Sequence, residues 1–309
     1  MEIRWKCRPD CFEIMGGNIM YIIMTDSCCD LNVKIAGSYE NFEIIPLSYT
    51  MSGETHANAL YDEETVKPYY DRLRAGEMST TSQIPPAIWQ EAFMTHAKKG
   101  EAVLCLVFSS ALSGTYGSAC VARDMVLEEI PDAVIQVVDT LSASAGQGLL
   151  VCDALDNRDN GMDIHENAKW LREHLQNYAQ WFTVDDLHFL SRGGRCSPSS
   201  AFFGSMLAIK PVLHVDSEGK LIARTKVRGR RQALKALAQK VGELEAEKDS
   251  RIFISHADCA EDAAFVKQSI VELYGWNPEK IVLSVVGPVI GSHAGPGTVA
   301  LFFRGKERG

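Results

Sequence analysis

The sequence predicts an α/β protein with two domains, from its length, its alternation of apolar runs with helix-like stretches, and a change in that alternation near residue 180. The chain has 309 residues, more than a single hydrophobic core usually supports. We expect an N-terminal three-layer α/β/α domain with a parallel sheet over residues 20–180. A C-terminal two-layer α/β domain with a mixed sheet is expected over residues 181–309.

The first domain is predicted from apolar runs that follow one another at the spacing of βαβ units. Strands are expected at residues 21–24, 43–47, 103–108 and 134–138, and helices at about 63–75, 86–98, 114–129, 142–157 and 164–177. Pro86 suits a first helical turn, and the acids of Asp62-Glu63-Glu64 suit a helix N-terminus. Residues 1–19 lack this periodicity, so we expect an extension outside the fold.

The pattern of polar and apolar residues is different in the second domain. Residues 210–215 and 220–227 alternate in polarity around Asp216-Ser217-Glu218-Gly219, which predicts an antiparallel hairpin. Helices are expected at 229–247 and 260–273, strands at 251–255 and 281–286, and a helix-like tail after Thr298.

Composition narrows the classes of function. A formal net charge of −9 argues against a nucleic-acid partner, which needs a basic face. No run reaches the roughly 18 apolar residues of a membrane span, and no cleavable signal is recognisable. We therefore expect a cytoplasmic protein with at most transient membrane contact. The nine cysteines are mostly single and lack zinc-ligand spacing, so no metal and no cofactor are expected.

Polar residues follow three of the predicted parallel strands. Ser109 to Tyr116 follows the run at 103–108, Thr25-Asp26-Ser27 follows the first strand, and Asp139-Thr140 follows the fourth. Ligands bind outside the carboxyl ends of strands in open α/β sheets. Hydroxyl groups and free helix N-terminal amides there suit an anionic group.

The glycine-rich segment from Gly287 to Thr298 has two interpretations. It is a tight turn with a capped helix, or a place where the backbone approaches a ligand closely. His293, set among glycines, favours a hydrogen-bonding role. An acyl hydrolase or transferase with Ser113 as nucleophile and His293 as base is the enzymatic alternative. The sequence around Ser113 lacks the Gly-x-Ser-x-Gly motif of a nucleophile elbow, and no acidic residue is marked as the one that would orient His293.

Two basic segments stand out on this acidic chain. Gly193-Gly194-Arg195 reads as the end of a helix, and Lys226 to Arg231 carries four cations in six residues. Such a run is a solvated face or a surface that docks an acidic protein.

Six motifs occur in one order and together resemble the DegV family: Thr25-Asp26-Ser27, Ser79-Thr80-Thr81-Ser82-Gln83, Ser110 to Tyr116, Gly193-Gly194-Arg195, Ile209-Lys210-Pro211 and Ile290 to Gly297. The resemblance runs from about residue 20 to the C-terminus. It implies a protein that encloses one long-chain fatty acid, with the carboxylate at the domain junction and the acyl chain in an apolar tunnel. In bacteria such proteins are the non-catalytic subunit of a fatty acid kinase. They present the carboxyl group to a separate ATP-binding subunit that makes acyl phosphate for phospholipid synthesis.

The resemblance also implies roles for individual residues. Thr81 and Ser113 would donate hydrogen bonds to the carboxylate, His293 would support it directly or through water, and Ser82 and Gly114 would lie alongside. Candidates for the tunnel wall, not separable from ordinary core residues, are Phe202, Phe203, Met206, Leu207, Ile209 and Ile290. Kinase docking would fall to Arg228, Arg230, Arg231 and, more weakly, Arg195. A lipid sensor without a kinase partner is the remaining alternative.

Overall fold

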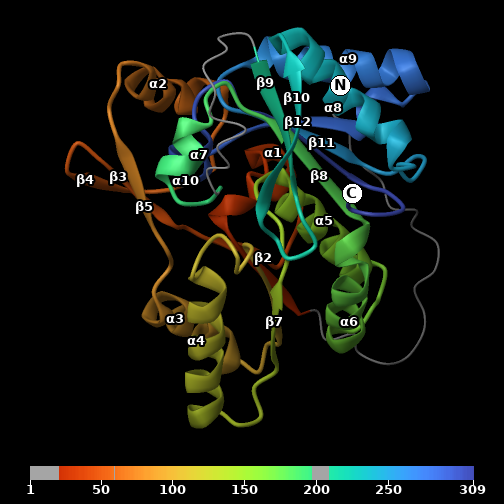
Figure 1. Cartoon of the computed structure of the whole chain (residues 1–309). Coiled ribbons are helices and arrows are strands. Elements are labelled where there is room, and N and C mark those ends of the chain that lie inside the picture. The colour runs from red at the N-terminus through yellow and green to blue at the C-terminus, as the bar shows by residue number, and fades with distance from the viewer. Residues whose placement is uncertain (1–20, 59, 197–208) are drawn as a thin grey trace.

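The structure, a computed structural model, describes residues 21–58, 60–196 and 209–309. It contains a parallel sheet, a mixed sheet and a small antiparallel sheet, connected by ten α-helices in the described residues (Figure 1). The predicted α/β fold class is confirmed.

The first sheet is fully parallel, as predicted, in the order β2-β1-β6-β7. Its strands are β1 (Ile22–Asp26), β2 (Phe42–Ile45), β6 (Val103–Val107) and β7 (Ile135–Asp139). One face packs on α3 (Pro86–Ala97) and α4 (Thr115–Glu129), the other on α5 (Ala145–Asp159) and α6 (Ile164–His174). Successive residues of β6 serve opposite faces: Cys105 joins the core under α3 and α4, and Leu104 joins the core under α5.

The second sheet is mixed, and the predicted hairpin is present in it. Its order is β10-β9-β8-β13-β11-β12, with only the β11–β12 pair parallel. The strands are β8 (Tyr178–Thr183), β9 (Ile209–Val215), β10 (Leu221–Arg228), β11 (Ile252–His256), β12 (Ile281–Val285) and β13 (Val299–Arg304). Helices α8 (Arg230–Glu243) and α9 (Ala260–Tyr274) cover one face, and α5 packs on the other. Helix α5 therefore lies between the two large sheets.

One expectation for this sheet was wrong. Residues 299–304 form the strand β13, not a helix-like tail. The strand is buried on both faces, so its sequence is a continuous apolar run with no alternation to separate it from a helix. The expected domain boundary near residue 180 falls within β8, and the division into two domains stays a prediction.

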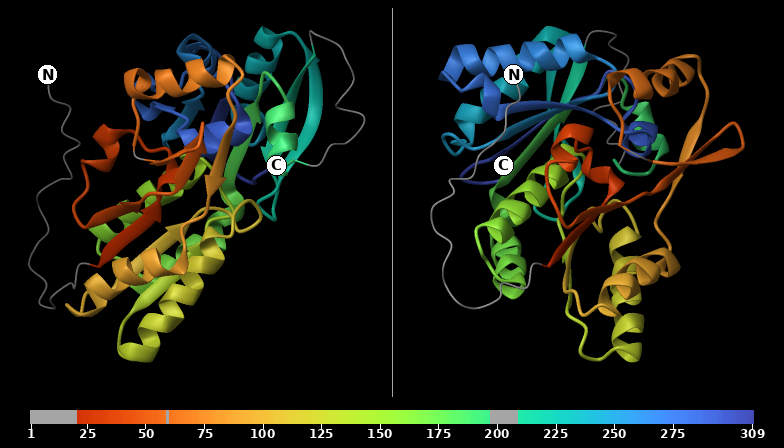
Figure 2. Two further views of the ribbon diagram at one scale, coloured as in Figure 1. Left: turned by 90° about the vertical axis from the view of Figure 1, so that its left-hand side faces the viewer. Right: turned by 180° about the vertical axis from the view of Figure 1, so that it is seen from behind.

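The small antiparallel sheet was not anticipated. It consists of β3 (Ser48–Met51), β4 (Glu54–Ala57) and β5 (Ser79–Ser82), in the order β4-β3-β5, and it extends from one side of the molecule (Figure 2). Its strands are short and polar, so they carry little hydrophobic pattern. Helix α2 (Glu63–Arg74) connects it to the second sheet, because Tyr70 of α2 donates a hydrogen bond to the carbonyl of Val286.

Short helical segments complete the described chain. They are η1 (Ser27–Cys29), α1 (Val33–Ala36), η2 (Leu175–Asn177), α7 (His188–Arg192), η3 (Pro278–Lys280) and α10 (Pro288–Ala294). Helix α10 is the form that the glycine-rich segment takes, and Gly287 precedes its first turn. Within the described residues, no helix combines the length and the apolar character that crossing a bilayer requires.

Candidate functional site

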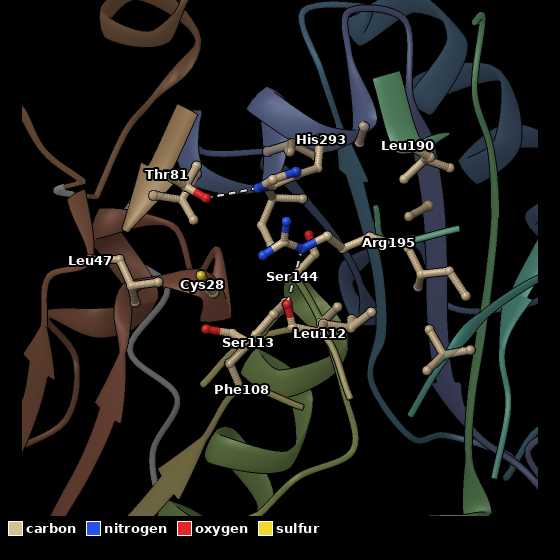
Figure 3. Close-up of a pocket in the computed structure, with 18 of the residues that line it drawn as sticks. Cys28, Leu47, Thr81, Phe108, Leu112, Ser113, Ser144, Leu190, Arg195 and His293 are labelled. Atoms are coloured by element: carbon tan, nitrogen blue, oxygen red, sulfur yellow. Dashed lines mark hydrogen bonds between the residues drawn. The ribbon is translucent and has the colours of Figure 1, made fainter. Parts of the chain in front are cut away.

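A cavity of about 220 Å³, partly open to solvent, lies where the carboxyl ends of the first sheet meet β5, α10 and the second sheet (Figure 3). It contains the residues that the sequence grouped into one site. Its wall includes Thr81, Ser82, Ser113, Gly114 and His293. The structure thus brings together three segments that are far apart in the sequence.

Thr81 and His293, which both line the cavity, form a polar contact with each other. Thr81 is on β5 and His293 is near the end of α10, and the distance between Thr81 Oγ1 and His293 Nε2 is 2.8 Å (Figure 3). The contact joins β5 of the small sheet to α10, which follows β12 of the second sheet.

The imidazole of His293 is neutral near pH 7. Burial lowers its pKa to about 4, helped by the nearby positive charges of Arg195 and Arg192. Its Nδ1 is buried against Gly193 and has no hydrogen-bond partner in the described residues. A buried N–H without an acceptor is rarer than a bare acceptor, so we place the proton on Nε2. That N–H then donates to Thr81 Oγ1, and the hydroxyl hydrogen of Thr81 is left for a ligand.

Ser113 and Gly114 lie at the N-terminus of α4. The Ser113 hydroxyl is 2.9 Å from Thr115 Oγ1 and accepts the backbone N–H of Thr115 at 3.2 Å. A Cβ on Gly114 would lie 2.0 Å from the side-chain oxygen of Gln83, so the Gln83 side chain packs directly on the backbone of Gly114. The first turn of α4 therefore adds a hydroxyl and amide dipoles to the rim.

Arg195 also lines the cavity, although its sequence position suggested a docking surface. Its guanidinium lies between His293 and Ser113 in Figure 3 and donates to the backbone carbonyls of Leu112, at 3.2 Å, and Gly193. Both acceptors are neutral, so the positive charge is not compensated by these contacts. The rim thus combines neutral donors with one half-buried cation, a set suited to an anion.

Apolar side chains form most of the remaining wall. They come from the segments that follow β2 and β6, from α7, from the second sheet and from α10 with the segment before it: Leu47, Phe108, Leu112, Phe182, Leu190, Val215, Leu221, Val286, Val289, Ile290, Ala300 and Phe302. Ile290 is the only predicted tunnel residue among them in the described residues, since Ile209 is not in the wall. Phe202, Phe203, Met206 and Leu207 lie outside the described residues. Sequence reasoning missed the residues on β8, β9 and β13, which look like ordinary core positions.

Two buried carboxyl groups lie directly behind residues of the cavity wall. Asp26 accepts the backbone N–H groups of Cys28 and Phe108, and Asp30 accepts the Ser144 hydroxyl and the Gly287 N–H. Burial raises the pKa of Asp26 to about 6 and that of Asp30 to about 7. These groups connect the end of β1 to α5 and to the start of α10, and their partners Cys28, Phe108 and Ser144 line the cavity.

The arginines at the end of β10 and the start of α8 have different surroundings. Arg230 donates to Asp262 Oδ2 at 2.8 Å and to the Gly297 carbonyl at 2.6 Å, so it holds α8 against the turn after α10. Arg231 stacks over the Phe265 ring at 4.1 Å. Arg228 is exposed at the end of β10. None of the three lies in the cavity wall.

The contacts at the rim bear on the enzymatic alternative. A serine nucleophile needs a base within hydrogen-bond reach, but His293 Nε2 contacts Thr81, and Ser113 contacts Thr115. His293 Nδ1 faces the Gly193 backbone, where a triad would place a carboxylate. In the described part of the chain, no His, Cys, Asp and Glu side chains are grouped to hold a metal ion.

Comparison with known proteins places this site in a family. A family model described as "Uncharacterised protein, DegV family" matches residues 20–306. A DegV domain-containing protein of Clostridium perfringens is 40% identical over 290 residues, which are 93% of this chain and 98% of the relative.

Solved structures agree with the sequence match. A DegV lipid-binding protein from Thermotoga maritima is 30% identical with a TM-score of 0.81, over 94% of this chain and 99% of its own. A fatty-acid-binding DegV family protein from Streptococcus agalactiae is 30% identical with a TM-score of 0.80, over 93% of this chain and 99% of its own.

Proposed function

This chain belongs to the DegV family, and on that premise we propose that it binds one long-chain fatty acid in the cavity between its two large sheets. The carboxylate would lie at the rim formed by Thr81, Ser113 and Arg195. The acyl chain would extend along the apolar wall. The solved relatives whose names record lipid or fatty-acid binding support this proposal.

The observation that carries the proposal is the division of the cavity into a donor-lined end and an apolar remainder. Thr81 has a hydroxyl hydrogen free for the ligand once His293 donates to its oxygen. Ser113 and the first turn of α4 face the same end, with Arg195 beside them. Carboxylates are held by such charge-assisted hydrogen bonds.

The two parts of the cavity would contribute differently to binding. Burial of a methylene group is worth about 0.8 kcal/mol, so a chain of roughly sixteen carbons gains on the order of 10 kcal/mol. The hydrogen bonds at the rim are worth less in net free energy because the carboxylate leaves water to make them. Affinity would come mainly from the acyl chain, and the rim would set the orientation.

We further propose that the protein is non-catalytic alone and presents the carboxylate to a separate ATP-binding kinase subunit in the cytoplasm. Carboxylate oxygens held by hydrogen bonds remain able to attack a phosphoryl group that a partner supplies with ATP and metal. The products would be an acyl phosphate and ADP, which leaves as the bond between the β- and γ-phosphates of ATP breaks. Exposed Arg228, with Arg231 beside it, is the docking surface that remains once the internal contacts of Arg230 are considered.

The experiment that tests fatty-acid binding is native and denaturing mass spectrometry of purified protein incubated with palmitate. We expect one palmitate per chain that is released on unfolding. Thr81→Val and Ser113→Ala should each weaken binding by roughly 1 to 3 kcal/mol, because a buried carboxylate oxygen loses its donor. Thr50→Val removes a hydroxyl from the same small sheet, on its exposed side, and serves as the matched control.

Two results would overturn the proposal. If the protein binds none of the saturated and unsaturated fatty acids from twelve to twenty carbons, the proposal of fatty-acid binding is wrong. Turnover of an acyl ester that disappears in Ser113→Ala would instead establish the hydrolase or transferase alternative.

A further inference from the structure

Behind the Thr81–His293 contact lies a cluster of three buried hydroxyl groups, which we call the hydroxyl brace: Tyr69, Ser79 and Ser292. Their residues are 6%, 7% and 3% exposed. The hydroxyl oxygen of Ser292 is 2.7 Å from that of Ser79 and 2.9 Å from that of Tyr69. None of the three lines the cavity.

The brace joins the same two elements as the contact at the rim. Ser79 and Thr81 are two residues apart on β5, so their side chains project from the same face of the strand. Ser292 and His293 are neighbours on α10. Two parallel links therefore hold β5 to α10: a buried one of 2.7 Å between Ser79 and Ser292, and a cavity-facing one of 2.8 Å between Thr81 and His293.

Helix α2 contributes Tyr69, the third residue of the hydroxyl brace. The Ser292 hydroxyl donates to the carbonyl of Pro288 at 2.8 Å. The Tyr69 hydroxyl lies 3.0 Å from the same carbonyl and 2.9 Å from Ser292 Oγ, and its one hydrogen is donated to one of these two oxygens. With its own hydrogen donated to Pro288, Ser292 is the acceptor for the Ser79 hydroxyl. A Cβ on Gly291 would lie 2.5 Å from Tyr70 Oη, so α10 rests directly on α2.

The position of α10 matters because His293 has little else to hold it. The helix has seven residues, and the imidazole makes one hydrogen bond within the described residues, to Thr81. A hydrogen bond weakens steeply when its geometry changes by a few tenths of an ångström. The separation of β5 and α10 therefore decides whether Nε2 donates to Thr81.

We propose that the hydroxyl brace sets the geometry of the Thr81–His293 pair, so that Ser79, Ser292 and Tyr69 are positioning residues for the carboxylate site. The role in ligand binding rests on the proposed function. The brace acts through the pair and does not touch the ligand. Its effect on affinity therefore exists only while the pair is intact.

A double-mutant cycle on palmitate affinity tests this dependence. Ser79→Ala should weaken binding about three- to tenfold in the wild-type background, the range expected for one net hydrogen bond. In a Thr81→Val background it should produce no further loss. Tyr69→Phe should change affinity in the same direction by a smaller factor, since the Ser79–Ser292 link remains. Ser269→Ala, which removes a similarly buried hydroxyl from α9, should leave affinity unchanged.

A second readout needs no ligand. In ¹⁵N-labelled protein the ring nitrogens of His293 should show the Nε2-protonated tautomer, and Ser79→Ala should shift or broaden that signal. Equal losses of affinity from Ser79→Ala in both backgrounds, or a His293 signal that Ser79→Ala does not alter, would overturn the proposal. If wild-type protein takes up no fatty acid, the proposed function fails, and the ring signal alone decides whether the brace positions the pair.

Discussion

Replacing Gly193 by alanine adds one carbon atom, the Cβ, next to the imidazole of His293. Gly193 ends α7 with φ −70° and ψ −9°, a conformation that alanine adopts without strain. Its Cβ would lie 2.3 Å from His293 Nδ1 and 3.2 Å from Cε1 and Cγ. The substitution therefore introduces a steric contact with the imidazole and little else.

The size of the effect follows from these distances. Non-bonded heavy atoms pack at about 3.5 Å or more, so the ring has to move by about 1 Å. A shift of that size takes the 2.8 Å contact between Nε2 and Thr81 Oγ1 out of hydrogen-bonding range. The lost hydrogen bond costs about 0.5 to 1.5 kcal/mol, and an off-rotamer ring costs a similar amount. We expect Gly193→Ala to lower the free energy of unfolding by roughly 1 to 3 kcal/mol.

Urea denaturation in two backgrounds separates this contact from other causes. In His293→Ala protein there is no ring to collide with, so Gly193→Ala should cost only a few tenths of a kcal/mol. Gly117→Ala is the matched control: it is inside α4 with open space around its Cβ, and it should raise stability by about 0.5 to 1 kcal/mol. Equal destabilisation by Gly193→Ala with and without His293 would refute the reasoning.

The remaining predictions concern pH and partner binding. Burial raises the pKa of Asp30 to about 7, so the native carboxyl keeps its proton between about pH 4 and 7 while the unfolded one loses it. The contribution of Asp30 to the free energy of unfolding should therefore fall as the pH rises through this window, by at most about 1.4 kcal/mol per pH unit. Buried Asp26 adds a fall of the same sign and buried His293 a rise, so the measurement is the difference between wild type and Asp30→Asn: the slope from urea titrations at a series of pH values should be more positive in the variant, and an unchanged slope would show that Asp30 does not contribute. Arg228→Glu should leave palmitate affinity intact and reduce acyl phosphate formation several-fold when a DegV-partner kinase and ATP are added. Lys248→Glu, at the opposite end of the second sheet, is the control, and equal loss in both variants would argue against a docking role.

The sequence predicted elements well where apolar pattern and turn chemistry agree. The strands β1, β6 and β7 are apolar runs followed by polar turns, and all three lie in one parallel sheet. The strand β13 was assigned wrongly because burial on both faces erases alternation. The small sheet was missed because Ser79 to Ser82 stabilises the fold through hydroxyl contacts, which leave no periodic signal.

The candidate site was predictable in part. Family motifs indicated Thr81, Ser113 and His293, and the structure places them around one cavity. The contact between Thr81 and His293, and the position of Arg195 beside them, depend on how β5, α10 and α7 pack. No local pattern records such packing. Gly193 was interpreted as part of a helix end, and only the structure shows that its lack of a side chain leaves room for the imidazole.

The order of strands in the second sheet has a consequence for how the nascent chain folds. Strand β13 lies between β8 and β11, so residues 299–304 separate partners that are synthesised earlier. The parallel sheet uses only residues 22–139 and can assemble while the rest is still being translated. The second sheet cannot close until its last strand has left the ribosome exit tunnel. Cavity formation therefore has to follow the synthesis of residues 299–304, and ribosome stalling within β13 would leave the ligand site unbuilt.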